Sequence, residues 1–175
     1  MIETLGQLVF LYITLKLAYW CFQLLRAFGP HVKPVQFSAF GSWTIVTGGT
    51  DGIGREYARQ LAQQGQNIII VGRNTTKLAE IKAEIESRGR ACRTIQADLS
   101  RQVEIDRAAK SVGKLCDELD VGMLINNAGV SYPHMDYYHD VSSDMLDCLV
   151  NVNCSALMMI TQAFIKQRVN KKKGL

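Results

Sequence analysis

The chain has 175 residues, 47% hydrophobic and 21% charged, which allows one globular core with a short appendage and excludes two full domains. Its net charge of +4 comes from scattered Lys and Arg, apart from three lysines at 171–173 that we interpret as a solvated helix end, so nucleic-acid binding is not indicated. The five cysteines are odd in number and lack C-x-x-C spacing. We interpret them as reduced thiols in a compartment such as the cytosol, packed as small hydrophobes.

Residues 1–28 are predicted to form a hydrophobic membrane anchor. The stretch from Leu5 to Leu25 reaches the roughly 20 apolar residues that span a bilayer. Lys16 near its middle costs about 2.5 to 3.5 kcal/mol on insertion scales, which the apolar neighbours largely offset. An interfacial helix and a buried packing helix are the alternatives. A cleavable signal peptide fits poorly, because Glu3 replaces the basic start and no cleavage site follows.

Residues 29–42 are predicted to be a linker, because one glycine and two prolines interrupt the helical pattern there. Arg26 and Lys33 follow the apolar run, and no Lys or Arg precedes it. This asymmetry predicts a cytoplasmic position for the domain that follows.

From residue 43 to residue 175, short apolar runs alternate with longer amphipathic stretches, the pattern of parallel strands joined by crossover helices. The predicted strands are 43–47, 67–72, 92–97 and 121–126, and the predicted helices are 52–64, 75–88, 101–119 and 142–168. We therefore expect an α/β fold, a partial Rossmann-type doubly wound parallel sheet of order 3-2-1-4, with the fourth strand at an edge.

A glycine-rich turn joins the first predicted strand to the first predicted helix. Gly48 permits a tight exit from the strand, Gly52 lets the backbone approach a pyrophosphate, and Gly54 lets the helix pack closely. The helix start then directs N–H groups at phosphates. Ordinary strand-to-helix turns also use glycine, but here the flanking strand and helix both match the dinucleotide-binding pattern. The residues predicted to bind the cofactor here are Gly48, Thr50, Asp51, Gly52, Ile53 and Gly54.

The residue after the second predicted strand favours NADP(H) over NAD(H). Sites that select NAD place an acid there, which hydrogen-bonds the ribose 2′-OH. This chain has Arg73, whose guanidinium matches a 2′-phosphate, and Lys77 one helical turn further on can add positive charge. The alternative is that Arg73 is an ordinary surface residue.

Residues 42–175 resemble the short-chain dehydrogenase/reductase family. The turn described above is similar to the cofactor motif of the family, the pair at 98–99 resembles the one that contacts adenine, and 126–129 resembles the fourth-strand Asn-Asn-Ala-Gly motif. The resemblance adds Asp98, Leu99, Asn127, Ala128 and Gly129 to the predicted cofactor site. The anchor and Ser131-Tyr132-Pro133 are similar to the branch of very-long-chain 3-oxoacyl-CoA reductases, 17β-hydroxysteroid dehydrogenases and hydroxysteroid dehydrogenase-like proteins.

The resemblance implies an NADPH-dependent oxidoreductase that reduces a 3-oxoacyl-CoA or a steroid-like ketone by hydride transfer. It implies a lipophilic substrate, a membrane partner and a homodimer in the complete protein. The expected location is the endoplasmic reticulum membrane with the domain facing the cytosol, and the mitochondrion is the alternative.

Catalysis in the family uses an Asn, a Ser and a Tyr-x-x-x-Lys pair. Asn153 matches the Asn, and we expect it to be buried on a stripe with Leu146, Leu149, Val150, Leu157, Ile160 and Phe164. The alternative is a structural Asn that bridges to the sheet. The only Tyr-x-x-x-Lys, Tyr12 to Lys16, lies in the anchor and is rejected. Because the chain ends where the family would enter its fifth strand, it is expected to be inactive as it stands. A non-catalytic cofactor-binding or scaffold protein is the alternative.

Two histidines, His134 and His139, lie near Asp136 and Asp140 in a tyrosine-rich loop. A metal site is not favoured there. The loop is predicted to be a wall of the substrate cleft.

Overall fold

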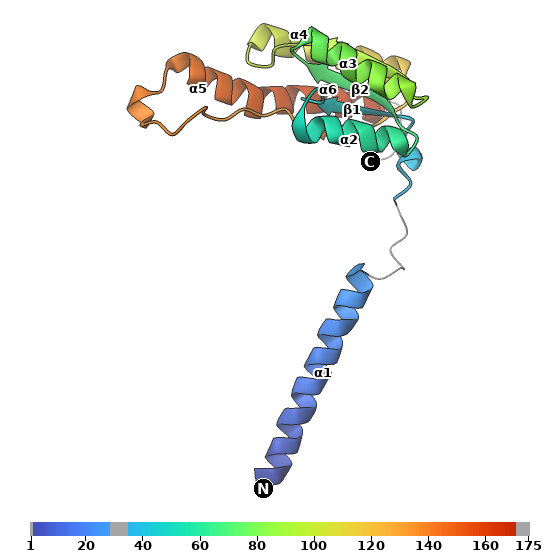
Figure 1. The fold of residues 1–175 in the computed structure, drawn as a ribbon, viewed down its shortest axis with the longest axis vertical. Coiled ribbons are helices and arrows are strands. Elements are labelled where there is room, and N and C mark those ends of the chain that lie inside the picture. Colours follow the sequence, from blue (N-terminus) through green and yellow to red (C-terminus); the bar gives the residue numbers. More distant parts are fainter. Residues whose placement is uncertain (1, 29–34, 171–175) are drawn as a thin grey trace. The chain divides into compact units, whose positions relative to one another are not determined.

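The computed structural model describes residues 2–28 and 35–170, and it divides the chain into two compact units, Met1–Gln36 and Phe37–Leu175 (Figure 1). The predicted linker therefore lies only partly within the described residues, since 29–34 fall outside them. Residues 37–42 belong to the second unit, which begins earlier than the predicted boundary at residue 43. A short 3-10 helix, Phe37–Ala39, opens this unit. The terminal lysines at 171–173 also fall outside the described residues.

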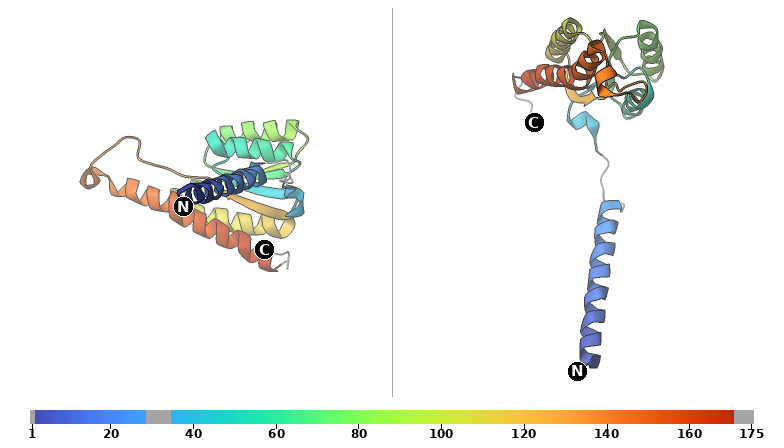
Figure 2. Two further views of the ribbon diagram at one scale, coloured as in Figure 1. Left: turned by 90° about the horizontal axis from the view of Figure 1, so that it is seen from below. Right: turned by 90° about the vertical axis from the view of Figure 1, so that its left-hand side faces the viewer.

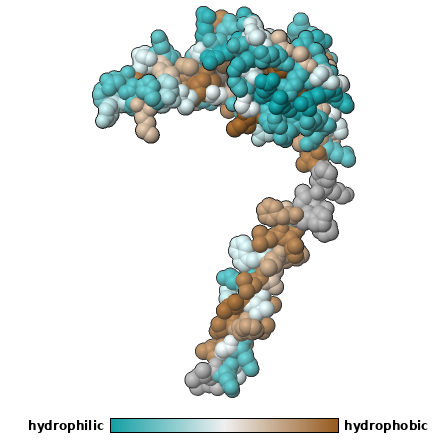
Figure 3. Space-filling model, viewed as in Figure 1, coloured by the Kyte–Doolittle hydropathy of each residue, from teal (hydrophilic) through white to brown (hydrophobic). Residues whose placement is uncertain are grey.

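Helix α1, Ile2–Phe28, makes up the described part of the first unit. Its large apolar side chains are exposed, and Figure 3 shows apolar surface along most of its length. The Nζ atom of Lys16 donates a hydrogen bond of 3.3 Å to the hydroxyl of Tyr12. Two helices, Glu3–Phe28 and Ser143–Asn170, are long and apolar enough to cross a membrane. That finding rests on length and composition alone, and the second of these helices packs on the sheet described next.

Four parallel strands form the sheet of the second unit. They are β1, Trp43–Thr47, β2, Asn67–Gly72, β3, Cys92–Gln96, and β4, Val121–Asn126. Their order is β3-β2-β1-β4, as predicted. Trp43 lies opposite Asn67 on one side and Val121 on the other, so β1 is hydrogen-bonded along both edges.

The two faces of the sheet are covered by different helices (Figure 2). Helices α2, Gly52–Gln63, and α3, Thr75–Ser87, bury apolar side chains on one face, and α4, Gln102–Glu118, and α6, Ala156–Asn170, bury theirs on the other. The alternation within β1 explains this arrangement, because Ile45 and Val46 point to opposite faces and are both fully buried. The first core is built around Val46, Ile68, Ile70, Leu61, Ile81 and Ile85, and the second around Ile45, Ile69, Ile105, Val112, Val152 and Ile160.

The last predicted helix, 142–168, is interrupted. Helix α5, Ser143–Val150, and helix α6 are separated by a π-helical turn, Asn151–Ser155, in which the N–H of Ala156 donates to the carbonyl of Asn151. The wider turn changes which side chains face the core, so the predicted apolar stripe is partly wrong. Val152, Ala156 and Ile160 are buried, whereas Val150 and Leu157 are 56% and 44% exposed. The predicted burial of Asn153 is also wrong, because this residue is exposed.

All five cysteines are free thiols. Cys92 in β3 and Cys116 in α4 are buried, as expected of small hydrophobic residues, while Cys21 and Cys154 are exposed and Cys148 is half-buried. Burial raises the pKa of the Cys92 thiol to about 12, which keeps it protonated and unreactive at neutral pH.

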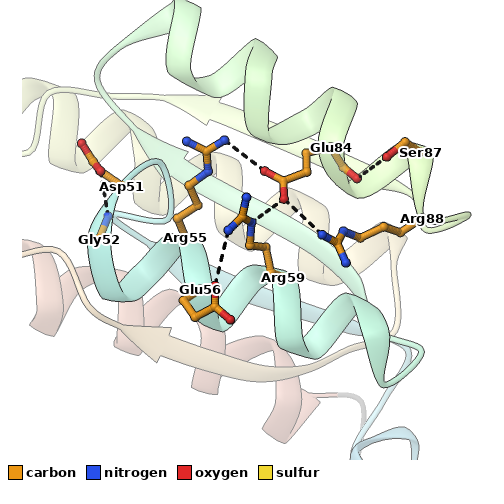
Figure 4. Close-up of polar contacts among 8 residues, drawn as sticks. All are labelled: Asp51, Gly52, Arg55, Glu56, Arg59, Glu84, Ser87 and Arg88. Atoms are coloured by element: carbon orange, nitrogen blue, oxygen red, sulfur yellow. Dashed lines mark hydrogen bonds and ion pairs between the residues drawn. The ribbon is translucent and has the colours of Figure 1, made fainter.

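A cluster of charges joins α2 to α3 (Figure 4). The carboxylate of Glu84 accepts hydrogen bonds from Arg55 at 3.0 Å, from Arg88 at 3.3 Å and from Arg59. Burial alone would raise the pKa of Glu84, but the hydrogen bonds and positive charges of Arg59 and Arg55 outweigh it and hold the pKa below its usual value.

Replacing Glu84 by Gln is expected to destabilise the domain at neutral pH, by an amount that depends on pH. Because the folded-state pKa is lowered, the stabilisation is present above the unfolded-state pKa of about 4.3 and is lost as the pH falls through the folded value. Urea unfolding at a series of pH values measures this. Glu80→Gln, an exposed position on the same helix, is the control. A Glu84→Gln deficit that stays constant down to acidic pH would contradict the assignment.

Candidate functional site

A cavity of about 440 Å³ opens at the carboxyl ends of the strands. It lies where β1 separates β2 from β4, so the chain crosses from one side of β1 to the other at this point. In open α/β sheets, ligands bind in the crevice at such a switch point. The cavity is lined by Gly48, Thr50, Asp51, Gly52, Val71, Gly72, Arg73, Ala97, Asp98, Leu99, Ser100, Asn127, Ala128, Gly129, Val130, Cys148 and Val152.

The glycine-rich turn leaves its strand and enters α2 with almost no room for side chains. Gly48 has φ of +64°, and a Cβ atom there would lie 2.9 Å from the Cα of Ala128. At Gly54 a Cβ would lie 2.4 Å from the carbonyl oxygen of Gly48 and 2.3 Å from Nδ2 of Asn127. Gly52 has φ of +49° and open space around it. The backbone is tightly packed at Gly48 and Gly54 and is open at Gly52, where a diphosphate can approach it.

The two basic residues predicted to select the cofactor are Arg73, in the turn after β2, and Lys77, in the first turn of α3. Arg73 lines the cavity and is exposed, and Asn74 caps α3 by accepting a 3.0 Å hydrogen bond from the N–H of Lys77. Lys77 does not line the cavity. Its Nζ atom donates instead to the carboxylate of Asp51 at 2.5 Å, and this hydrogen bond, with that from the Gly52 N–H, lowers the pKa of Asp51. The ion pair ties the glycine-rich turn to the turn after β2.

The loop after β3 forms one rim of the cavity, on the β2 side of β1. Leu99 is buried, and the Asp98 carboxylate accepts hydrogen bonds from the N–H of Ser100 at 3.1 Å and from its hydroxyl at 2.8 Å. Burial alone would raise the pKa of Asp98, but these hydrogen bonds and the nearby charges of Arg73 and Arg101 lower it. Asp98 is therefore a fixed acceptor in the cavity that Arg73 also lines.

Thr47 at the end of β1 fixes the Asn-Asn-Ala-Gly segment after β4. Its hydroxyl oxygen accepts the N–H groups of Asn127 at 3.0 Å and Ala128 at 3.1 Å. The side-chain amide of Asn127 in turn donates to the carbonyls of Thr47 and Gly48, at 3.2 and 3.1 Å. The two loops that meet at the switch point thus hold each other in place.

Replacing Thr47 by Val, which has the same shape, is expected to lower the free energy of unfolding by about 2 kcal/mol, because two N–H groups lose their acceptor in a part-buried position. The midpoint of urea unfolding measures the effect. Thr94→Val, on an exposed position of β3, is the matched control and is expected to be close to neutral. Equal unfolding midpoints for the two variants would show that the Thr47 hydroxyl does not hold the segment.

The π-helical turn extends one amide to each side of the cavity. The Nδ2 of Asn151 donates to the carbonyl of Ser100 at 2.8 Å. The side chain of Asn153 makes two hydrogen bonds to Val130, accepting its N–H at 3.1 Å and donating to its carbonyl at 2.9 Å. Asn153, although exposed, is thus held beside the loop after β4.

The structure brings most of the predicted cofactor residues to one cavity. Those in its lining are Gly48, Thr50, Asp51, Gly52, Arg73, Asp98, Leu99, Asn127, Ala128 and Gly129, while Ile53, Gly54, Lys77 and Asn153 lie outside the lining. The sequence analysis did not assign seven of the lining residues to the site, namely Val71, Gly72, Ala97, Ser100, Val130, Cys148 and Val152. It also did not assign Asn151, which holds the Ser100 carbonyl. The signal in the sequence for Asn151 was that it is a second asparagine, two residues before the candidate catalytic Asn153.

The tyrosine-rich loop lies away from this cavity. Residues 131–140 are exposed, and none of them lines it. His139 stacks on Tyr137 with ring centroids 5.6 Å apart and lies 3.4 Å from the carboxylate of Asp140. Within residues 2–28 and 35–170, no group of three His, Cys, Asp or Glu side chains is arranged to hold a metal ion. The role of this loop as a wall of the substrate cleft stays a prediction.

Comparison with known proteins supports the same interpretation. The family model for short chain dehydrogenases matches residues 42–175. The chain is 31% identical over 166 residues to the very-long-chain 3-oxoacyl-CoA reductase of Macaca fascicularis, which covers 93% of this chain and 52% of that protein. It is 38% identical over 136 residues to the human inactive hydroxysteroid dehydrogenase-like protein 1, covering 77% of this chain and 40% of that one. The chain thus spans about half the length of these curated relatives, or less.

Solved structures match the second unit. A metagenomic short-chain oxidoreductase in complex with NADP superposes with a TM-score of 0.67 at 30% identity, covering 77% of this chain and 59% of that one. A short-chain dehydrogenase from Sphingobium yanoikuyae in complex with NADPH gives 0.66 at 27% identity, covering 75% and 50%. The sheet order, the cavity at the switch point and these matches agree, and the chain therefore belongs to the short-chain dehydrogenase/reductase family of oxidoreductases, in the branch of the very-long-chain 3-oxoacyl-CoA reductases and hydroxysteroid dehydrogenase-like proteins.

Proposed function

We propose that this chain binds NADP(H) and forms the cofactor-binding part of a membrane-attached reductase of lipophilic ketones. The observation that carries the proposal is that Arg73 lines the same cavity as Asp98 and the glycine-rich turn. A guanidinium there suits a 2′-phosphate. When bound, NADPH supplies the hydride, and the residues around the cavity bind and orient it.

Titration of the full chain in detergent with NADPH and NADH tests cofactor binding. We expect saturable NADPH binding and at least tenfold weaker NADH binding, because only NADPH carries the phosphate that pairs with Arg73. Equal affinities would remove the basis for NADP selection. Failure to bind either nucleotide would contradict the proposal as a whole.

The proposed substrates are 3-oxoacyl-CoA thioesters and steroid-like ketones. Support comes from the very-long-chain 3-oxoacyl-CoA reductases among the relatives and from the apolar surface of α1, which suits a protein that works at a membrane. NADPH consumption by the endogenous protein with each substrate class tests the proposal. Turnover of neither class would contradict it.

Asn153 is the proposed catalytic residue within the present sequence. Its side chain is held by both backbone groups of Val130, so its orientation is defined next to the loop after β4. By resemblance to the family, it orders a water in the proton relay. Full turnover of the endogenous enzyme carrying Asn153→Ala would show that this role is wrong.

A non-catalytic cofactor-binding or scaffold protein is the second candidate function. The similarity to the inactive hydroxysteroid dehydrogenase-like protein 1 favours it. The intact mass and sequence of the endogenous protein distinguish the two. A mass above 19.5 kDa, with a Tyr-x-x-x-Lys following a Ser-containing strand, supports the enzyme. A Phe in place of that Tyr, or a mass of 19.5 kDa, supports the scaffold.

We further propose that α1 spans the membrane of the endoplasmic reticulum and that the second unit lies in the cytosol. The length and exposure of α1 and the position of Arg26 in its last turn support this orientation. Glycosylation acceptors placed at either end of the chain test it, and modification of the N-terminal acceptor alone is expected. Modification at the C-terminal end would reverse the orientation. Release of the protein from membranes by alkaline carbonate would favour an interfacial helix. Recovery of the protein in the mitochondrial fraction would contradict the assignment to the endoplasmic reticulum.

A further inference from the structure

The π-helical turn Asn151–Ser155 lies at the inner end of the cofactor cavity, between its two rims. Val152 of the turn and Cys148 of the preceding helix α5 line the cavity. Ser100 lies in the rim that follows β3, and Val130 lies in the rim that follows β4. Side chains from one short turn therefore contact both rims of the site. Such turns are frequent at functional positions in helices.

The two asparagines of the turn point to different rims. Residues two positions apart in a helix leave on roughly opposite sides of its axis, also where one turn is widened. Asn151 reaches Ser100, and Asn153 reaches Val130. The amide of Asn153 belongs to the catalytic position proposed above, whereas nothing so far described uses Asn151.

The contact of Asn151 continues to the residues that face the cofactor. Its Nδ2 holds the carbonyl of Ser100 at 2.8 Å, and the N–H and hydroxyl of Ser100 hold the carboxylate of Asp98. Asn151 is half-buried, and its partner is a backbone carbonyl, so the contact fixes the path of the loop rather than one side chain. A change at Asn151 is therefore transmitted to Asp98 through Ser100.

We propose that Asn151 is a positioning residue that holds the loop 98–100 in the conformation that receives the adenosine half of the dinucleotide. This inference rests on the proposed binding of NADP(H). The two amides then have different roles. Asn151 positions the loop that receives the adenosine half, and Asn153 acts in the reaction.

Two variants of Asn151 in the full chain test the inference, with adenosine 2′,5′-bisphosphate as the probe. Asn151→Ala is expected to weaken binding of the probe about tenfold, the effect of one well-formed hydrogen bond. Asn151→Asp is expected to weaken it further, because a carboxylate at this position repels the carbonyl of Ser100. Gln162→Ala removes an exposed amide from α6 away from the cavity and is expected to bind the probe normally.

Hydrogen exchange of the backbone amides of Ser100 and Arg101, measured without ligand, separates this inference from the proposed function. Faster exchange in Asn151→Ala, with an unchanged melting temperature and exchange elsewhere, is the expected result. Normal exchange, or a probe affinity equal to that of the unmodified chain, would overturn the role of Asn151. If the unmodified chain binds no probe, the proposed function fails, and the exchange result still decides whether Asn151 holds the loop.

Discussion

Replacing Arg73 by Glu is expected to weaken NADPH binding about 100-fold, which corresponds to about 2.7 kcal/mol, and to leave NADH binding unchanged or stronger. The guanidinium that suits the 2′-phosphate is lost, and a carboxylate takes its place near Asp98. The new carboxylate repels a phosphate but accepts a hydrogen bond from a ribose 2′-OH, as acids do at this position in NAD sites. The titration described for the proposed function measures both affinities.

The matched control for this variant is Arg93→Glu. It makes the same charge reversal on an exposed position of β3 that does not line the cavity. We expect it to change NADPH affinity only slightly, since exposed charges at a distance are screened by salt. Equal losses of NADPH and NADH affinity in Arg73→Glu would show that Arg73 supports the fold or the whole site rather than the 2′-phosphate.

Replacing Gly54 by Ala is expected to lower the free energy of unfolding by about 3 kcal/mol and to abolish NADPH binding. The added methyl group would lie 2.4 Å from the carbonyl oxygen of Gly48 and 2.3 Å from Nδ2 of Asn127. Neither atom can move away freely. The oxygen belongs to the Gly48 backbone, and the Asn127 amide is hydrogen-bonded to the carbonyls of Thr47 and Gly48. The glycine-rich turn must therefore separate from the segment after β4.

Gly113→Ala is the control for the packing effect, since it is the same substitution inside a helix. A Cβ at Gly113 meets only Nε2 of Gln167, at 3.9 Å, so we expect a gain of about 0.5 to 1 kcal/mol from the better helix propensity of Ala. Urea unfolding compares the two variants. Gly54→Ala with the stability and NADPH affinity of the unmodified chain would mean that the close approach is not needed.

The regular part of the fold could be predicted because its signals are local. The predicted bounds of β1, β2 and β4 agree with the structure, and β3 ends one residue earlier, at Gln96. Strands β1, β2 and β4 are short, mainly apolar runs closed by Gly or Asn, whereas β3 alternates buried Cys92 and Ile95 with exposed polar residues. Parallel pairing of β1 with both neighbours follows from the crossover helices.

The π-helical turn could not be predicted from periodicity. One widened turn leaves no mark in composition, since Val150 and Val152 are equally apolar although one is exposed and the other buried. The prediction of an uninterrupted helix therefore placed Asn153 on the buried face, whereas it is exposed. Ser100 and Val130 were missed for a different reason: both lie in loops of ordinary composition and join the cavity only through the fold.

The sequence predicted the place of Arg73 correctly but did not predict the partner of Lys77. Arg73 lies at the cavity as expected. The partner of Lys77 depends on the distance between two loops that belong to different strand-to-helix connections, and the structure pairs this lysine with Asp51. No local pattern contains that distance.

The central position of β1 affects how the domain is assembled on the ribosome. The contact of Thr44 with Gln66 joins residues 22 apart, whereas the contact of Thr47 with Ile125 joins residues 78 apart. At roughly 5 to 20 residues per second, β1 waits on the order of 4 to 16 s for β4 to be synthesised. Strand β1, which is buried on both faces in the folded domain, therefore pairs first with β2 and carries an open edge during this interval. Chaperone protection of the nascent chain matters most in these seconds, before the second edge of β1 is closed.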